Sequence, residues 1–441
     1  MRDILVTFIV FGSLPYILKR PHLGILLWGW LAYMNPHKLS YGFAHNFPFS
    51  LTVALVILIG LFFSKEPKKI PWTIELRILV IFIVWMFITT LNSMYPDLAW
   101  RQWDKVWKIQ LMTFITIILM QDKWRVQAMI WVIALSLGFY GFKGGIFTVL
   151  TGGAYAVYGP SGTFIYGNNE IGLALIMTIP LIRYLQLVTT QPFIRQGLLI
   201  TMWLCVLSVI GTQSRGALVG ILVMGVFLIL KSRKKFVMVL LILILMPIIF
   251  SFMPESWHNR MGTIQTYEQD GSAMGRINAW WMAFNLAKDN IFGGGFECFQ
   301  WFSFYRYAPI SDNVHDAHSV YFEVLGEHGF IGLTLFLLLG FVTLNSARKI
   351  IKEAKKSEET LWMSDLAAML QVSLIGYAAS GAFLGLAYFD LYYHLVAMVV
   401  ILKALLLKST QNGLPTASKE KLSNSSHLPD SDIDYRSREK Q

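Results

Sequence analysis

Residues 76–92 read LRILVIFIVWMFITTLN, a run in which Arg77 is the one charged residue. A helix of about 20 apolar residues crosses the hydrocarbon core of a bilayer, and shorter helices suffice where other helices surround them. This run therefore predicts a transmembrane helix. Comparable runs recur along nearly the whole chain, so we expect one polytopic helix bundle rather than a series of soluble domains.

The composition of the whole chain agrees with this prediction. Only 14% of the 441 residues are charged, whereas 55% are hydrophobic and 15% are aromatic. A soluble domain has about 25% charged residues. A water-soluble enzyme is therefore excluded, and the predicted fold is an all-α polytopic membrane bundle.

The apolar runs predict 12 or 13 spans. The count depends on the first two runs, which are short and are separated by Lys19, Arg20 and Pro21. The basic residue and apolar stretch at the start, with no small-residue cleavage site after them, predict a retained first span. The candidate spans are about 4–18, 22–35, 48–64, 76–92, 106–121, 124–141, 170–188, 196–213, 216–231, 235–253, 319–347, 364–386 and 389–407.

The formal charge of +11 is concentrated in gaps between the runs. Basic clusters mark cytoplasmic loops, so this charge predicts a membrane topology and no nucleic-acid partner. The basic gaps are 65–69, 123–125, 183–195, 231–235 and 348–356. The gaps expected on the external face are 93–105, 142–169, 254–318 and 387–389.

We expect a single membrane domain over residues 1–407, with a long external loop at about 254–318. Residues 408–441 carry six basic and five acidic residues and little apolar content, which predicts a disordered cytoplasmic tail. Cys205 and Cys298 are predicted to be free thiols.

The long external loop carries the first candidate for chemistry. GRINAWWMAFNLAKD (275–289) has apolar residues at helical spacing behind Arg276, which predicts a helix lying along the membrane surface. An interfacial aromatic belt equally explains its tryptophans. Because a guanidinium offers a planar fork to a phosphate, Arg276 is a candidate anion ligand.

His318 opens the next predicted span. A neutral imidazole can accept a proton from a hydroxyl near neutral pH, so His318 is the candidate base. A histidine at a helix start is more often a cap or an interface residue, and the residues alone leave that alternative open. His328, further along the same helix, is expected to pack. No second ligand motif supports a metal site at Asp312, His315 and Asp316, so we expect no metal and no cofactor.

Two further external segments carry candidate residues. Arg215, in GTQSRGALVG (211–220), lies beside hydrocarbon, where a charge is retained if it pairs, snorkels or binds a ligand. Pairing with a carboxylate and binding an anion both remain open. Residues 143–172 are rich in Gly, Asn and Tyr, which predicts an ordered loop. The candidate contacts to a sugar or lipid head group are Tyr158, Asn168 and Asn169, together with Glu327.

A glycine triplet, Gly293-Gly294-Gly295, permits close approach of the backbone to an anion or to another helix. It lacks the preceding strand and the following lysine of a phosphate-binding loop. We therefore expect the triplet to form a turn or a packing contact.

Taken together, SRGAL (214–218), an Arg-x-x-Ala-Trp element, a glycine-rich turn and AHSVYFEVLGEHGFIGL (317–333) resemble the O-antigen ligase and polymerase superfamily of bacterial membranes. The chain looks most like the O-glycosylation ligases associated with exosortase A systems, over about residues 1–405. The segments that carry this likeness are NPHKLSYGFAHNFPF (35–49), YGFKGGIFTVLTGGAYAVYGPSGTFIYGNNE (140–170), GTQSRGALVG (211–220), RMGTIQTYEQDGSAMGRINAW (260–280) and AHSVYFEVLGEHGF (317–330).

The resemblance implies a glycosyltransferase of the bacterial inner membrane with its active site facing the periplasm. The implied donor is an undecaprenyl-diphosphate-linked glycan. The implied acceptor is a hydroxyl or amide of a protein, lipid or polysaccharide. By motif, Arg215 and Arg276 would hold the diphosphate and His318 would be the base, in an inverting, metal-independent transfer.

Two alternatives remain open from the sequence. A polymerase of the same superfamily would join repeat units of the same lipid-linked sugar. A transporter or flippase would move the lipid-linked sugar across the membrane. Broken helices and charges at mid-span would favour the transporter, whereas the candidate charges here are predicted at the external boundary.

Overall fold

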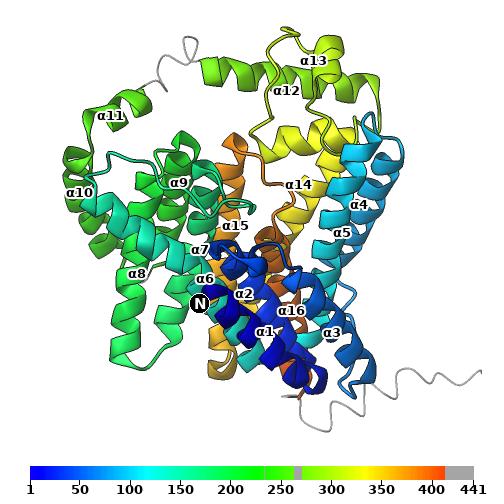
Figure 1. The fold of residues 1–441 in the computed structure, drawn as a ribbon. Helices are drawn as coiled ribbons and strands as arrows, with labels where there is room; N and C mark the ends of the chain where they lie inside the picture. Colours follow the sequence, from blue (N-terminus) through cyan, green and yellow to red (C-terminus); the bar gives the residue numbers. More distant parts are fainter. Residues whose placement is uncertain (233, 263–270, 413–441) are drawn as a thin grey trace, which may run out of the picture.

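The computed structural model describes residues 1–232, 234–262 and 271–412, and these residues form helices and no β-strand (Figure 1). The all-α prediction is confirmed. The helices are α1 (Arg2–Lys19), α2 (Pro21–Tyr33), η1 (Pro36–Leu39), η2 (Phe43–His45), α3 (Phe49–Phe63), α4 (Ile74–Leu91), α5 (Pro96–Leu119), α6 (Lys123–Leu150), α7 (Asn168–Val188), α8 (Pro192–Gly211), α9 (Arg215–Lys231), α10 (Lys235–Phe252), α11 (Glu255–Gly262), α12 (Gly271–Asp289), α13 (Trp301–Tyr307), α14 (Val320–Ala354), η4 (Glu358–Thr360), α15 (Leu361–Ser380), η5 (Gly381–Phe383) and α16 (Asp390–Asn412).

Every predicted apolar run overlaps one of these helices, but not every such helix is long enough to cross a bilayer. Among the described residues, seven helices have the length and hydropathy of a membrane span: α4, α6, α7, α8, α14, α15 with its short flanking helices, and α16. The apolar helix α3 is shorter. Helix α2 has 13 residues and is about 20 Å long at 1.5 Å per residue. The protein is a multi-pass membrane protein, and in the part of the chain that the structure describes seven helices have the length and hydropathy of a full span, against the 12 or 13 expected.

Several helices extend beyond the apolar runs that predicted them. Helix α5 begins at Pro96 rather than near residue 106. The apolar run did not reveal this start, because the first half of the helix mixes charged residues with tryptophans and is less apolar than a membrane span. Helix α6 continues to Leu150, into the predicted external segment. Helix α16 ends at Asn412. The rest of the predicted tail, 413–441, and positions 263–270 of the predicted loop lie outside the described residues.

Contacts between the loops agree with the predicted topology. At the expected cytoplasmic end, Arg125 donates to both carboxylate oxygens of Glu66, at 2.6 and 3.0 Å. At the expected external end, the α4–α5 connection meets the segment after α12, where the Met94 amide donates to the Gly294 carbonyl at 2.9 Å. In Figure 1, α12 and α13 lie along the upper edge of the bundle.

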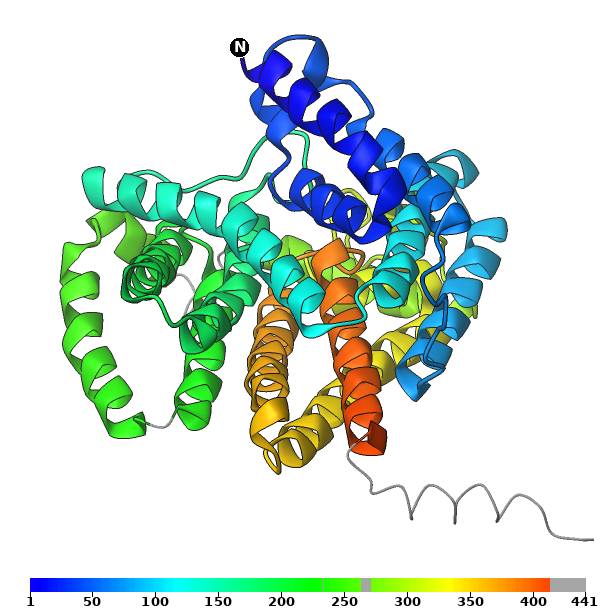
Figure 2. The ribbon, with the colours of Figure 1, turned by 90° about the horizontal axis from the view of Figure 1, so that it is seen from below.

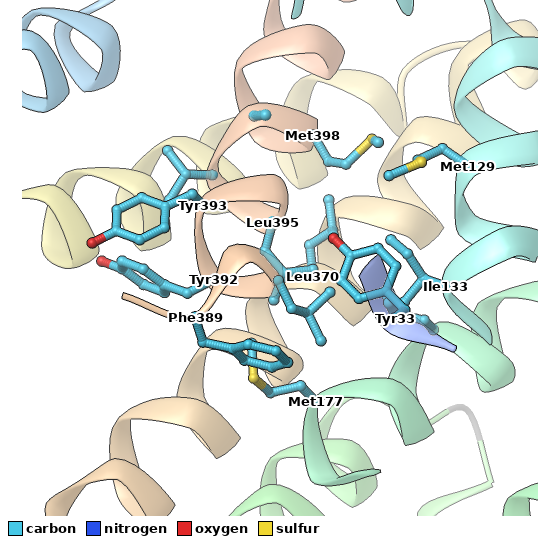
Figure 3. Packing of buried hydrophobic residues seen from close by; sticks show 14 of the residues in the cluster. Tyr33, Met129, Ile133, Met177, Leu370, Phe389, Tyr392, Tyr393, Leu395 and Met398 are labelled. Carbon is cyan, nitrogen blue, oxygen red and sulfur yellow. The ribbon is translucent and has the colours of Figure 1, made fainter. Parts of the chain in front are cut away.

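Helices α15 and α16 lie at the centre, between the α8–α10 side and the α4–α5 side (Figures 1 and 2). Side chains of α2, α6, α7, α15 and α16 meet in the apolar core that Figure 3 shows. The most apolar window of α7 is 83% buried and that of α16 is 72% buried. The amino-terminal helices and the late helices therefore form one packed body, because both contribute to the same core.

Helix α14 is broken at Gly329, which has φ 65° inside the helical stretch. The nine residues from Val320 to His328 form a short helix before the break. A break leaves carbonyl groups without intrahelical partners, and apolar surroundings make such groups costly. Three donors outside the helix compensate at consecutive carbonyls: the Gly294 amide to Gly326 at 2.8 Å, the Gly295 amide to Glu327 at 2.9 Å and the Trp85 indole to His328 at 2.8 Å.

The glycine triplet thus forms a turn packed on a helix, as expected. Gly293 also has a positive φ of 65°, and a Cβ built on it would lie 2.6 Å from the Gly326 carbonyl oxygen. At Gly329 a Cβ would lie 2.4 Å from the Ile291 carbonyl oxygen. Both positions require glycine for the backbone angle and for the close approach of two chain segments.

We predict that Gly329→Ala lowers the thermal unfolding midpoint of the detergent-purified protein. The left-handed backbone costs a non-glycine residue about 1–3 kcal/mol, and the clash with the Ile291 carbonyl adds to that cost. The control is Gly225→Ala in α9, where a Cβ meets nothing within 4 Å. Equal midpoints for the two variants would contradict this role of Gly329.

Candidate functional site

Helix α12 holds the loop that carries His318. The Asn278 side-chain amide donates to the carbonyls of Ile310, at 2.8 Å, and Asn313, at 3.0 Å, and its oxygen accepts from the Ile310 amide at 2.9 Å. The Trp280 indole donates to the Ala317 carbonyl at 2.8 Å. The loop is therefore fixed to α12 at both ends, and its last anchor lies one residue before His318.

The predicted helix is present as α12, and its buried residues, apart from Asn278, are small or apolar. Its position along a membrane surface remains a prediction. Trp280 stacks on Phe322 of α14, with ring centroids 4.9 Å apart and an interplanar angle of 6°. The next residue, Trp281, points in a different direction and is 52% exposed. The two tryptophans therefore differ in role: Trp281 fits the predicted aromatic belt, whereas Trp280 positions the His318 loop.

His318 itself has a left-handed backbone, with φ 41°. This conformation is uncommon outside glycine, and strained residues of this kind cluster at functional sites. The residue lies just before Ser319, the cap position of α14. Its side chain is 33% exposed, so the imidazole is partly accessible at the end of the bundle that the sequence predicts to be external.

The charges around His318 favour its neutral form. Burial lowers the pKa of the His318 imidazole below the usual 6.5, and the charges of Arg276 and His315 lower it further. The carboxylate of Asp316 raises it, with Oδ2 3.9 Å from Nδ1 of His318. A neutral imidazole at neutral pH is the form that can accept a proton.

Arg276 lies in the same neighbourhood, in the second turn of α12. The positive charge of Arg276 interacts electrostatically with His318 and with Glu170, which lies in the first turn of α7. Asp316 acts on Glu170 as well. The beginnings of α7 and α12 and the His318 loop therefore lie close together, and Gly275, next to Arg276, packs against His315 of that loop. The roles of Arg276 and His318 remain predictions.

Arg215 is the first residue of α9, and the start of α7 anchors the residues just before it. Ser214 caps α9 by accepting from the Ala217 amide at 3.1 Å, and its hydroxyl donates to Asn169 at 2.5 Å. Asn168 donates to the Thr212 carbonyl at 2.9 Å. These two asparagines, predicted as sugar contacts, thus anchor the loop before Arg215; sugar binding by them remains a prediction.

A cavity of about 430 Å³ lies beside this site, with Asp316 in its wall. Its lining combines four carboxylates with one lysine, two glutamines and four aromatic rings. Carboxylates, amides and aromatic faces are suited to a polar organic ligand. The lining residues are Gln102, Lys105, Phe164, Glu297, Phe299, Gln300, Asp316, Glu323, Glu327, Gly385, Leu386, Tyr388 and Phe389.

Glu327 is fixed in the wall of this cavity. One carboxylate oxygen accepts from the Glu297 amide at 2.7 Å, and the other accepts from the Tyr388 hydroxyl. Burial raises the pKa of the Tyr388 phenol well above its usual range, so this hydroxyl stays a donor. Partial burial and the charge of Asp316 raise the pKa of Glu297, whereas Lys105 lowers it.

Two other predicted residues lie away from the cavity wall. The Tyr158 side chain is 59% exposed, and its contact with a sugar remains a prediction. His328 is fully buried, with Nδ1 2.7 Å from the Thr89 hydroxyl and its ring against Phe296 at 4.6 Å. His328 packs, as expected.

The sequence analysis considered Asp316 only in a metal cluster and missed most of the cavity wall. Within residues 1–232, 234–262 and 271–412, no group of three or more His, Cys, Asp or Glu side chains could hold a metal ion. Glu323 lies four residues before Glu327, a helical spacing that could have indicated a shared face. Lys105 and Gln102 gave no such signal, because they come from distant α5.

Comparison with known families agrees with the placement of the site. Residues 200–337 match the family described as O-antigen ligase. Residues 200–337 form an O-antigen ligase domain, which relates this part of the chain to the O-antigen ligase superfamily. Arg215, Arg276 and His318 all lie inside the matched residues, so the O-antigen ligase domain contains all three candidates. Residues 1–190 match a family of unknown function (DUF5935). No curated protein matches the chain.

We predict that Asn278→Ala loosens the His318 loop of this O-antigen ligase domain. Asn278 is buried, and its loss leaves loop groups unpartnered at about 1–3 kcal/mol for each buried group. Amide hydrogen exchange across 309–319 should accelerate about tenfold or more. Asn313→Ala is the control, because it removes an amide side chain from the loop but keeps the carbonyl that Asn278 binds. Unchanged exchange in the Asn278 variant would contradict the anchoring role.

Proposed function

We propose that the protein transfers a glycan from an undecaprenyl-diphosphate carrier to an acceptor hydroxyl or amide on the periplasmic side of the inner membrane. The observation that carries the proposal is the packing of α12 against the His318 loop, where Gly275 meets His315 and the charge of Arg276 acts on His318, inside the residues that match the O-antigen ligase family. The family supports a lipid-linked glycan donor at the general level. The resemblance to the exosortase-associated branch suggests O-glycosylation.

The donor diphosphate is assigned to Arg215 and Arg276. Guanidinium groups form paired, charge-assisted hydrogen bonds with phosphate oxygens. Arg215 begins α9, where the helix dipole also favours an anion. As the glycosidic bond to the diphosphate breaks, two guanidiniums stabilise the charge that develops on the leaving group. This arrangement requires no metal ion.

The acceptor proton is assigned to His318. The acceptor oxygen attacks the anomeric carbon, its proton passes to the imidazole, and the electrons of the broken carbon–oxygen bond leave with the diphosphate. Attack from the face opposite the diphosphate inverts the anomeric configuration. The lowered pKa of His318 keeps the imidazole ready to accept this proton at neutral pH.

The cavity is assigned to the acceptor side. The cavity wall holds four carboxyl groups, two amides and four aromatic rings but one lysine and no arginine, so it offers more partners to sugar hydroxyls than to a diphosphate. Sugar hydroxyls can donate to these carboxylates, and sugar rings can pack on the aromatic side chains. Asp316 lies in the cavity wall and beside His318, so an acceptor in the cavity approaches the base directly.

We predict that Arg215→Lys and Arg276→Lys each reduce transfer at least tenfold without loss of folded protein. An ammonium group cannot reproduce the bidentate fork on a phosphate. The measurement is glycan transfer by purified protein from a lipid-diphosphate donor. Arg306→Lys is the matched control, since its guanidinium pairs with Asp289 at 3.4 Å on an exposed surface. Near-wild-type turnover in both test variants would remove the diphosphate assignment.

We further predict that His318→Asn lowers turnover by roughly 10²- to 10⁴-fold while donor binding persists. Asparagine tolerates the left-handed backbone of this position, so the variant removes the base without adding strain. In the wild-type enzyme, the acidic limb of the kcat/KM profile should lie below pH 6.5, because the His318 pKa is lowered.

Donor binding is measured separately from turnover, by retention of labelled lipid-diphosphate glycan on the purified variant. Full turnover in His318→Asn would show that His318 is not the base. Loss of donor binding would show that it is a ligand of the diphosphate instead.

A further inference from the structure

Asp316 is held so that one carboxylate oxygen points toward the candidate base. Its Oδ1 accepts from the Ala317 amide at 2.8 Å, and its Oδ2 lies 3.9 Å from Nδ1 of His318. The Ala317 carbonyl is fixed by the Trp280 indole, and Ala317 is fully buried. Ala317, which lies between Asp316 and His318, is therefore held by hydrogen bonds at both its amide and its carbonyl.

The facing nitrogen of His318 lacks a partner. Nδ1 is buried and, among the described residues, makes no hydrogen bond. Buried polar atoms are nearly always hydrogen-bonded. A shift of about 1 Å would bring Asp316 Oδ2 to hydrogen-bond distance of this nitrogen. Catalytic hydrogen bonds are commonly long without substrate and tighten when the substrate binds.

We propose that Asp316 is the positioning residue of His318, accepting a hydrogen bond from Nδ1 so that Nε2 faces the acceptor as the proton-accepting atom. This inference rests on the proposed function, in which His318 is the base. The carboxylate selects the tautomer with the proton on Nδ1. When the acceptor proton arrives at Nε2, Asp316 remains ionised and stabilises the imidazolium.

The surrounding charges make this compensation necessary. Arg276 and His315 both disfavour a positive charge on His318, whereas Asp316 favours it. The charge of Asp316 also acts on the other carboxyl groups nearby, which are Glu170 from α7, Glu323 and Glu327 from α14, and Glu297. Without Asp316, the imidazolium would form beside Arg276 with no adjacent carboxylate on its own loop.

The test is Asp316→Asn in the full-length purified enzyme, with Asp312→Asn as the matched control from the same loop. We expect kcat to fall roughly 10²-fold, within the contribution of acid–base catalysis, with KM for the donor unchanged. The acidic limb of the pH profile should move to lower pH, because Asp316 raises the pKa of His318. Asp316→Glu should recover part of the rate, and Asp312→Asn should match wild type.

A double variant separates this inference from the proposed function. In a His318→Asn background, Asp316→Asn should cost nothing more, because Asp316 acts through the imidazole. If His318→Asn is itself fully active, the proposed function fails. If His318→Asn is inactive but Asp316→Asn keeps wild-type kcat and an unshifted pH profile, the positioning role is overturned. A lower rate with an unshifted profile would likewise overturn it, because that result indicates a purely structural role.

Discussion

The break of α14 at Gly329 is the constraint on which the external end of the molecule depends. Inside an apolar bundle, a helix can be interrupted only where other groups bind its free carbonyls. Here the Gly294 and Gly295 amides and the Trp85 indole bind three consecutive carbonyls. The glycine turn that follows α12 is thereby docked on α14, and α4 is tied to the same point.

This docking determines where the candidate chemistry lies. The turn positions the Glu297 amide on the Glu327 carboxylate and so forms one wall of the cavity. The turn also fixes the end of α12, and α12 in turn anchors the loop of His318 through Asn278 and Trp280. The break at Gly329 therefore positions α12, and α12 in turn positions the strained residue His318.

The sequence predicted what depends on neighbouring residues and missed what depends on long-range packing. Apolar runs and basic gaps are local, so the helices and their alternation were predictable. The turn at Gly293–Gly295 was also interpreted correctly from its lack of flanking signals. The break at Gly329 was missed, because a glycine within an apolar run does not by itself reveal φ. The cavity was missed because Lys105 and Glu327 meet only through the packing of distant helices, and the anchoring role of Asn168 depends on its contact with Thr212.

The central claim is that the external site catalyses glycan transfer by direct displacement. The most direct measurement is the anomeric configuration of the product formed when purified protein, treated with EDTA, is given a lipid-diphosphate glycan and a candidate acceptor. The account predicts a glycosylated acceptor whose anomeric configuration is opposite to that of the donor. Retention of configuration, or movement of the lipid-linked sugar across liposomes without any covalent product, would contradict it.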